Sequence, residues 1–262
     1  MIEAMLNRRL IATVSVLLLV GCSKDLDLKY LEKLPVEKIL EQGEQKMKDG
    51  NHDDAVQIFE ELERLYPYSK LTATAQLLAG DCYYKIKKYD EAVTAYEIFI
   101  KTHPTHDKVP YALFMLGLIN FEQMPIIERD QDVTIKALTY FSELHSRFPQ
   151  SEYIKASENM ILNLRQQMAG REVYAARYYQ TRKNYAASIM RLNVVIESYR
   201  ETKHVPEALH RLIECYVAMG LIQEAEKVNV VLQKSFPKES WARYAVNLLK
   251  SEHHTKQPKK LK

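Results

Sequence analysis

The stretch that decides the fold is residues 80–104, GDCYYKIKKYDEAVTAYEIFIKTHP, because its pattern recurs along the chain. The same glycine, alanine, aromatic and proline positions occur in residues 43–67, GEQKMKDGNHDDAVQIFEELERLYP, which begin 37 residues earlier. Further copies run from Gly117 to Pro149, with eight inserted residues, from Ile213 to Pro237 and, in degenerate form, from Ala176 to Arg200. Self-similarity at such a period indicates an array of stacked units, each of which buries its apolar face against its neighbours.

This pattern resembles the tetratricopeptide repeat (TPR), a helix pair of 34 residues with conserved small and aromatic positions. The first tryptophan of that repeat is missing here, and the connection after each proline is three residues longer. Gly50 and Gly220 occupy one repeat position and are expected to form the turn between the two helices of a pair. The sequence therefore predicts an all-α superhelical solenoid of about five TPR-like helix pairs.

Small and large side chains have separate roles in this prediction. Glycines in the first helix of a pair and alanines in the second allow the two helices to approach closely, and aromatic side chains of the second helix fill the wedge between pairs. The glycines are Gly43, Gly80 and Gly117, the alanines Ala55, Ala92, Ala137 and Ala225, and the aromatic residues Phe59, Tyr96 and Phe141. The prolines that follow are expected to end each second helix.

The repeats divide the chain into segments. We expect a signal peptide at 1–21, a lipidated tether at 22–35, TPR repeats 1–3 at 36–150, repeats 4–5 with a capping helix at 151–249, and a basic tail at 250–262. Within the fourth segment, the pattern predicts one helix over 151–168 and a second over 171–181. The insert around residues 123–132 is either a solvated loop or a docking loop.

The N-terminus is predicted to be a targeting signal. Arg8 and Arg9 precede the mostly apolar run 10–20, which is too short to cross a bilayer and is typical of a secretory signal. The ending Leu19-Val20-Gly21-Cys22 resembles the bacterial lipobox. This resemblance implies lipidation of Cys22, which would anchor the chain in a membrane. Because Ser23 stands where an inner-membrane retention aspartate would be, it also implies the periplasmic face of the outer membrane.

Composition and motifs argue against most kinds of chemistry. The 262 residues are 47% apolar and carry a formal charge of +3. The five lysines of the tail alone exceed this net positive charge, so nothing in the rest of the chain resembles a nucleic-acid footprint. The chain lacks the nucleotide-binding, hydrolase and metalloprotease motifs, and its histidines do not have metal-ligand spacing. Cys82 and Cys215 are expected to be buried and unpaired. The sequence thus indicates a binding protein without a cofactor, not an enzyme.

A binding surface is expected where the first helices of the pairs line the concave face. The outward positions of repeats 1–3 are unusually aromatic and suit an extended peptide. These groove residues are Leu40, Glu44, Met47, Leu77, Asp81, Tyr84, Tyr111, Phe114 and Phe121. In the alternative interpretation, the helix over 151–168 covers this surface and the aromatic residues belong to the core.

The combination of lipid signal, five repeats and insert resembles the BamD family, lipoproteins of the outer-membrane β-barrel assembly machine. The resemblance rests on 48-KDGN-51, 64-RLYPY-68, 103-HPTH-106 and 178-YYQTR-182, among other stretches. It implies that the N-terminal repeats bind unfolded β-barrel proteins, and it allows a second lipoprotein of the machine as a partner. It also implies that the C-terminal repeats dock on the POTRA domain of BamA nearest the barrel, where Arg191 aligns with a family arginine. Other candidates on that polar face are Arg177, Glu207 and His210.

Two alternatives remain open at this point. Another periplasmic TPR lipoprotein, an adaptor of cell-division or peptidoglycan machinery, would share the fold and the anchor. An enzyme with an unrecognised site would need clustered titratable groups in the groove, and Glu44 with Asp81 is the candidate pair.

Overall fold

The structure, a computed structural model, describes residues 28–127 and 129–256. A short 3-10 helix, η1 (Leu28–Lys33), is followed by eleven α-helices in this described part, which contains no strand. These are α1 (Val36–Lys48), α2 (His52–Leu65), α3 (Lys70–Lys85), α4 (Tyr89–Thr102), α5 (Val109–Glu122), α6 (Asp132–Arg147), α7 (Ile154–Thr181), α8 (Tyr185–Ser198), α9 (Val205–Ala218), α10 (Ile222–Ser235) and α11 (Ser240–Lys256). The predicted signal peptide and Cys22 lie outside the described residues.

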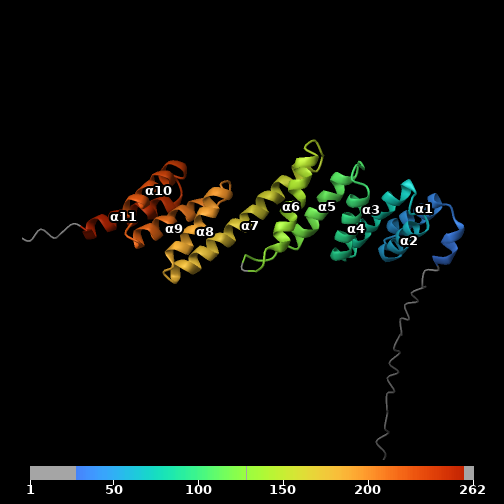
Figure 1. Ribbon diagram of the computed structural model, residues 1–262, viewed down its shortest axis with the longest axis horizontal. Coiled ribbons are helices and arrows are strands. Elements are labelled where there is room, and N and C mark those ends of the chain that lie inside the picture. Colours follow the sequence, from blue (N-terminus) through green and yellow to red (C-terminus); the bar gives the residue numbers. More distant parts are fainter. Residues whose placement is uncertain (1–27, 128, 257–262) are drawn as a thin grey trace, which may run out of the picture.

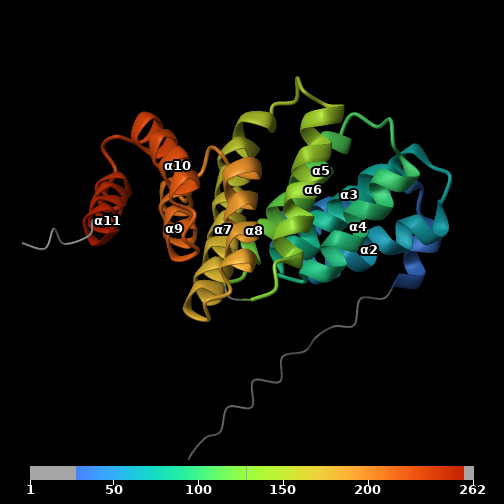
Figure 2. The same cartoon turned by 60° about the vertical axis from the view of Figure 1, so that its left-hand side comes forward.

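The helices pack as five antiparallel pairs, α1/α2 to α9/α10, and α11 closes the array. Figures 1 and 2 show these pairs following one another in chain order from the α1 end to the α11 end. This arrangement confirms the predicted all-α solenoid of five helix pairs. It stacks each pair on its neighbours, so the chain has a succession of small cores along its length.

The repeated glycines lie directly under the repeated aromatic rings. A Cβ atom added at Gly43 would be 2.3 Å from the Phe59 ring, and one at Gly117 would be 2.3 Å from the Phe141 ring. Each ring belongs to the second helix of the same pair, and it is fully buried there. These rings seat the two helices of one pair on each other, because only glycine leaves room for the ring. Tyr96 also contacts the next pair, as predicted, since its ring lies 6.4 Å from that of Tyr111.

The ends of the helices also repeat from pair to pair. The turn position between paired helices has a left-handed backbone in four repeats, at Gly50 (φ 78°), Lys87 (φ 61°), Lys183 (φ 58°) and Gly220 (φ 77°). The two glycines confirm the predicted turns, and the two lysines hold the same conformation at a steric cost. In four repeats the second helix ends two residues before a proline. It ends there because the residue that directly precedes a proline disfavours the α conformation.

One long helix replaces the two segments predicted over 151–168 and 171–181. Helix α7 is continuous for 28 residues through Gly170. A Cβ atom there would lie 3.1 Å from Ile127 Cδ1 and 3.2 Å from His204 Nε2, so the glycine permits a close approach and does not break the helix. Leu164 packs in the core of α3–α6, whereas Ala169 packs in the core of α8–α11. The boundary between these cores therefore falls inside α7.

The C-terminal capping helix is longer than the sequence indicated. Helix α11 continues to Lys256, beyond the predicted end at 249, and its Ala242, Ala245 and Leu249 side chains are buried against the preceding repeats. The first residues of the predicted basic tail thus form the last turns of this helix. Among the helices of residues 28–127 and 129–256, none has the length and apolar character needed to cross a membrane.

Candidate binding groove and docking surfaces

A pocket of about 290 Å³ lies on the face formed by α1, α3 and α5. Met47, Asp81, Tyr84 and Tyr111, all predicted groove residues, line it together. The remaining lining residues are His52, Lys85, Met115 and Leu118. The pocket therefore joins apolar side chains from three successive repeats to an acid and two bases, which is the composition of sites that fix an apolar ligand with a few polar groups.

Asp81 is fixed at the wall of this pocket by two hydroxyls. Tyr96 and Tyr111 each donate a hydrogen bond to Asp81 Oδ1, at 2.5 Å and 2.7 Å. Burial raises the pKa of Asp81, and the two hydrogen bonds only partly offset this effect. The carboxyl is thus committed to its tyrosine partners, and it is not paired with Glu44, which lies outside the set of lining residues.

Tyr84 spans the second and third repeats. Its hydroxyl donates a hydrogen bond of 2.8 Å to Glu122 Oε1, and its ring lies 6.1 Å from that of Tyr89. Burial and the Glu122 carboxylate raise the pKa of Tyr84 to about 12, so the hydroxyl remains a donor at neutral pH. The aromatic wall of the pocket is therefore held in place before any ligand arrives.

Other predicted groove residues lie elsewhere. Leu77 is buried in the core, and the ring of Phe114 stacks at 5.1 Å on Tyr153, just before the first turn of α7. Leu40, Glu44 and Phe121 are half-buried and do not line the pocket. Tyr153, which directly precedes α7, thus packs on Phe114 and also lies 5.7 Å from the ring of Tyr111, whereas Tyr84 and Tyr111 both line the pocket.

His52 is a pocket residue that the sequence pattern did not reveal. It is the first residue of α2, two positions after the left-handed turn at Gly50. Its Nδ1 atom is buried and has no hydrogen-bond partner among the described residues. Because projection of the first helices alone selected the candidates, a residue at the start of a second helix was left out, although adjacency to the turn could have indicated it.

The polar face predicted for partner docking is largely engaged within the chain. Arg177 of α7 and Arg211 of α9 both donate hydrogen bonds to Glu207 Oε1, and Glu207 is 8% exposed. Burial acts to raise the pKa of Glu207, but the arginines outweigh it and leave the pKa lowered. His210 is 6% exposed, with Trp241 of α11 packed on its ring at 5.3 Å. Glu207 therefore connects α9 to α7, and His210 connects α9 to α11. Both present little surface to a partner.

Arg191 occupies a different position from these three residues. Its side chain is about half exposed on α8, where it donates a long hydrogen bond of 3.2 Å to Glu172. The neighbouring Met190 and Val194 are 72% and 38% exposed. An arginine flanked by uncovered apolar side chains has the composition of a protein interface.

The insert folds back on α7. Gln167 donates a hydrogen bond to the Pro125 carbonyl oxygen at 2.5 Å, Arg171 donates one to the carbonyl oxygen of Arg129, and Ile127 packs against Gly170. These contacts hold the described part of the insert on α7, so this part is packed on the protein and is not a freely solvated loop. The insert thereby links the third repeat to the helix shared by both halves.

In residues 28–127 and 129–256, no cluster of three or more His, Cys, Asp or Glu side chains could hold a metal ion. Cys82 and Cys215 are buried free thiols, and burial raises the pKa of each, to about 12 for Cys82.

Comparison with known proteins identifies the family. The model of the YfiO family, described as an outer membrane lipoprotein, matches residues 32–231, which extend from η1 into α10. The chain belongs to the YfiO family. The match confirms the resemblance seen in the sequence, and the YfiO region contains the whole pocket, the insert and Arg191.

Relatives of this YfiO chain are named outer membrane protein assembly factor BamD. The protein from Caulobacter vibrioides is 34% identical over 87% of this chain and 75% of its own length. The protein from Neisseria meningitidis serogroup A is 31% identical over 91% of this chain and 95% of its own length.

Among solved structures, a thermophilic TPR protein from Thermus thermophilus aligns over 82% of this chain and all of its own, at 19% identity and a TM-score of 0.37. Because this TM-score is low, the description as TPR-like repeats rests on the helix pairs of the YfiO chain itself.

Proposed function

We propose that the chain is the lipoprotein subunit of the outer-membrane β-barrel assembly machine. Anchored through lipidated Cys22 at the periplasmic face of the outer membrane, it binds unfolded β-barrel proteins and docks on a POTRA domain of BamA for their insertion. Family membership and the name shared by its relatives support this proposal. The function is non-enzymatic, since holding and passing on a chain requires no covalent step.

The pocket of α1, α3 and α5 is the observation that carries substrate binding. Its methionines and Leu118 provide an apolar surface for side chains of an extended segment, and Lys85 lies at its exposed edge. An extended strand places alternate side chains on one face, so a row of apolar side chains can enter the pocket while polar ones face water. This proposal keeps Met47, Asp81, Tyr84 and Tyr111 as groove residues and adds His52.

Arg191 carries the docking proposal. The exposed Met190 and Val194 would be covered by the partner, and removal of water around an arginine strengthens its pairing with a carboxylate. Glu207 and His210 are left out because they are buried, and Arg177 acts indirectly by holding Glu207.

Docking is tested by affinity capture of the tagged, lipidated protein from detergent-solubilised envelopes. We expect near-stoichiometric recovery of BamA, lost with Arg191→Glu and kept with Arg243→Glu, an exposed arginine on α11. Recovery of BamA that is indifferent to Arg191 would remove the docking site. Recovery of cell-division or peptidoglycan factors without BamA would refute the proposed function.

Substrate binding is tested with a fluorescent peptide that carries the last strand of an outer-membrane β-barrel, compared with a scrambled version. We expect Met47→Asp to weaken binding about tenfold, a loss of about 1.4 kcal/mol, because it places a charge on the apolar wall. Lys48→Glu, one residue along and outside the pocket, is the matched control. Equal binding of the scrambled peptide would refute strand recognition.

A further inference from the structure

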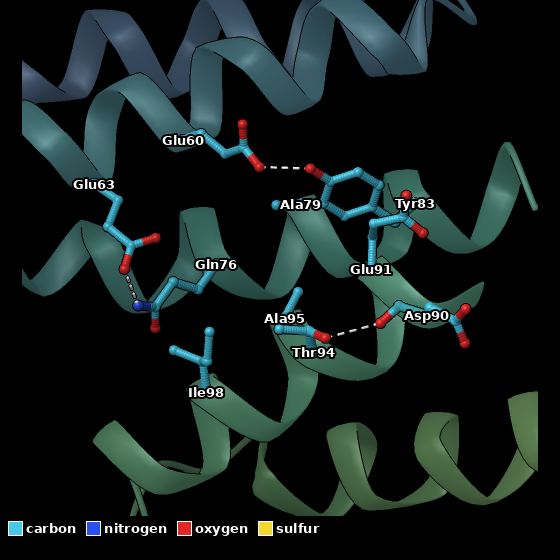
Figure 3. Close-up of a pocket in the computed structure, with 10 residues that line it drawn as sticks. All are labelled: Glu60, Glu63, Gln76, Ala79, Tyr83, Asp90, Glu91, Thr94, Ala95 and Ile98. Carbon is cyan, nitrogen blue, oxygen red and sulfur yellow. Dashed lines mark hydrogen bonds between the residues drawn. The ribbon is translucent and has the colours of Figure 1, made fainter. Parts of the chain in front are cut away.

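A second cavity, of about 310 Å³, opens on a different face of α3 from the groove. Figure 3 shows its walls, α2 and α4, with α3 between them. Its floor is apolar and includes Ala79, Ala95 and Ile98, and Ile98 is 42% exposed although it is a large aliphatic side chain. This cavity is separate from the substrate groove, with which it shares no lining residue.

Carboxylates surround this apolar floor. Glu60 and Glu63 extend from α2, and Asp90 and Glu91 from the first turn of α4 (Figure 3). The ten lining residues include these four acids and no lysine, arginine or histidine. Tyr83 donates a hydrogen bond to Glu60, and Gln76 donates one to Glu63, which fixes two of the carboxylates toward the cavity.

One basic neighbour stands beside this group without lining the cavity. Lys88 Nζ forms an ion pair of 2.9 Å with Asp53 Oδ1, and Glu60 and Glu91 add to the raised pKa of this lysine. Its charge is therefore largely matched by Asp53. The cavity itself keeps an excess of negative charge.

The next repeat shows that this cavity is not an obligatory gap of the fold. Counted from the repeat alanines Ala92 and Ala137, position 95 corresponds to Tyr140. The Tyr140 side chain is half-buried, and its hydroxyl donates a hydrogen bond to Glu97, the counterpart of Glu60. A tyrosine thus occupies in the third repeat the place that Ala95 leaves open in the second.

The two sites also differ in charge, and the site in the third repeat is the less acidic one. The counterpart of Glu91 in the third repeat is Lys136, and the counterpart of Asp90 is Ile135. The acidic, open cavity is therefore a property of these particular side chains and not of the helix-pair geometry, which is common to both repeats.

We propose that this cavity receives a lysine or arginine side chain from a basic segment of a partner protein. The methylenes of such a side chain pack on Ala79, Ala95 and Ile98, while its charged end reaches the surrounding carboxylates. Long basic side chains bind in this divided manner because their stem is apolar and their tip is charged. A volume of about 310 Å³ is at the lower end for ligand pockets, and it suits one or two side chains better than a folded surface.

The test is a titration of the full-length chain in neutral detergent micelles, carrying ¹³C-labelled isoleucine methyl groups. The probe is the capped peptide Ala-Lys-Ile-Lys-Ala, and Ala-Gln-Ile-Gln-Ala is its neutral control. We expect a saturable shift of the Ile98 methyl signal with the lysine peptide alone, which weakens as salt screens the carboxylates. Ile135, which is 48% exposed in the third repeat, should keep its signal unchanged.

Two variants copy the third repeat into the second. Ala95→Tyr fills the cavity and Glu91→Lys reverses one charge on the exposed first turn of α4, so each should abolish the Ile98 shift. Glu91→Lys decides the outcome if the larger tyrosine impairs folding. Glu97→Gln, the counterpart change at the filled site, should leave the shift intact. An equal response to the glutamine peptide, no response at Ile98, or a response that survives Glu91→Lys would overturn the proposal.

Discussion

Replacement of Gly117 by alanine probes the contact that seats the two helices of the third repeat. The new Cβ atom would lie 2.3 Å from Phe141 Cε1 and 2.6 Å from Cδ1, far inside van der Waals contact. Phe141 is fully buried, so its ring cannot move away into solvent. The helices must therefore separate, or the ring must leave its preferred rotamer.

Two effects of opposite sign set the magnitude. Overpacking of a well-packed core costs about 1–3 kcal/mol, and a contact this short belongs at the upper end of that range. Alanine gains about 1 kcal/mol over glycine in helix propensity. We expect the free energy of unfolding to fall by about 2 kcal/mol. At Gly80 the closest contact, with Tyr96, is 2.8 Å, so the two effects should nearly cancel there.

Urea unfolding followed by circular dichroism measures this difference. With a slope of about 2–3 kcal/mol per molar urea, the midpoint of Gly117→Ala should fall by about 0.7–1 M. In a Phe141→Leu background the ring is absent, and the same substitution should be neutral or stabilising. An equal loss of stability in both backgrounds would refute the reasoning, because the contact with the ring would then not be its cause.

Further outcomes follow from the turns and from the buried ion pairs. Lys87→Gly should raise the free energy of unfolding by about 0.5–1 kcal/mol, since glycine relieves the left-handed backbone at φ 61°. Gly220→Ala, at φ 77° with no atom within 4 Å of the added Cβ, should lower the free energy of unfolding by about 1 kcal/mol through backbone strain alone. Urea midpoints that move in the opposite direction would contradict both expectations. Glu207→Gln should lower the free energy of unfolding by about 1–2 kcal/mol at neutral pH, because two arginines stabilise the carboxylate. The lowered pKa of Glu207 means that this stabilisation is present above the ordinary glutamate pKa and is lost as pH falls through the lowered value, so parallel urea titrations should converge in acid and a pH-independent difference would argue against the charge.

Much of the fold could be predicted because its information is local. Glycine, alanine and aromatic residues at fixed spacing define which face of each helix is buried, and prolines mark where the second helices end. In a solenoid each pair contacts only its neighbours, so a pattern of 37 residues is sufficient to specify the packing. The prediction failed at α7, which was expected as two helices separated at residues 169–170, because the residues that pack on Gly170, Ile127 and His204, lie more than 30 positions away.

The candidate site was predicted only in outline for the same physical reason. The sequence by itself determined the helix pairs, the family and the face of the first helices that carries Met47 and Tyr84. Tertiary structure decided which outward residues remain accessible: Tyr153 covers Phe114, and Arg177 holds Glu207 from 30 residues away. Periodicity reports which side of a helix faces its own repeat, whereas exposure of the other side depends on segments distant in the chain, whose contacts no local pattern encodes.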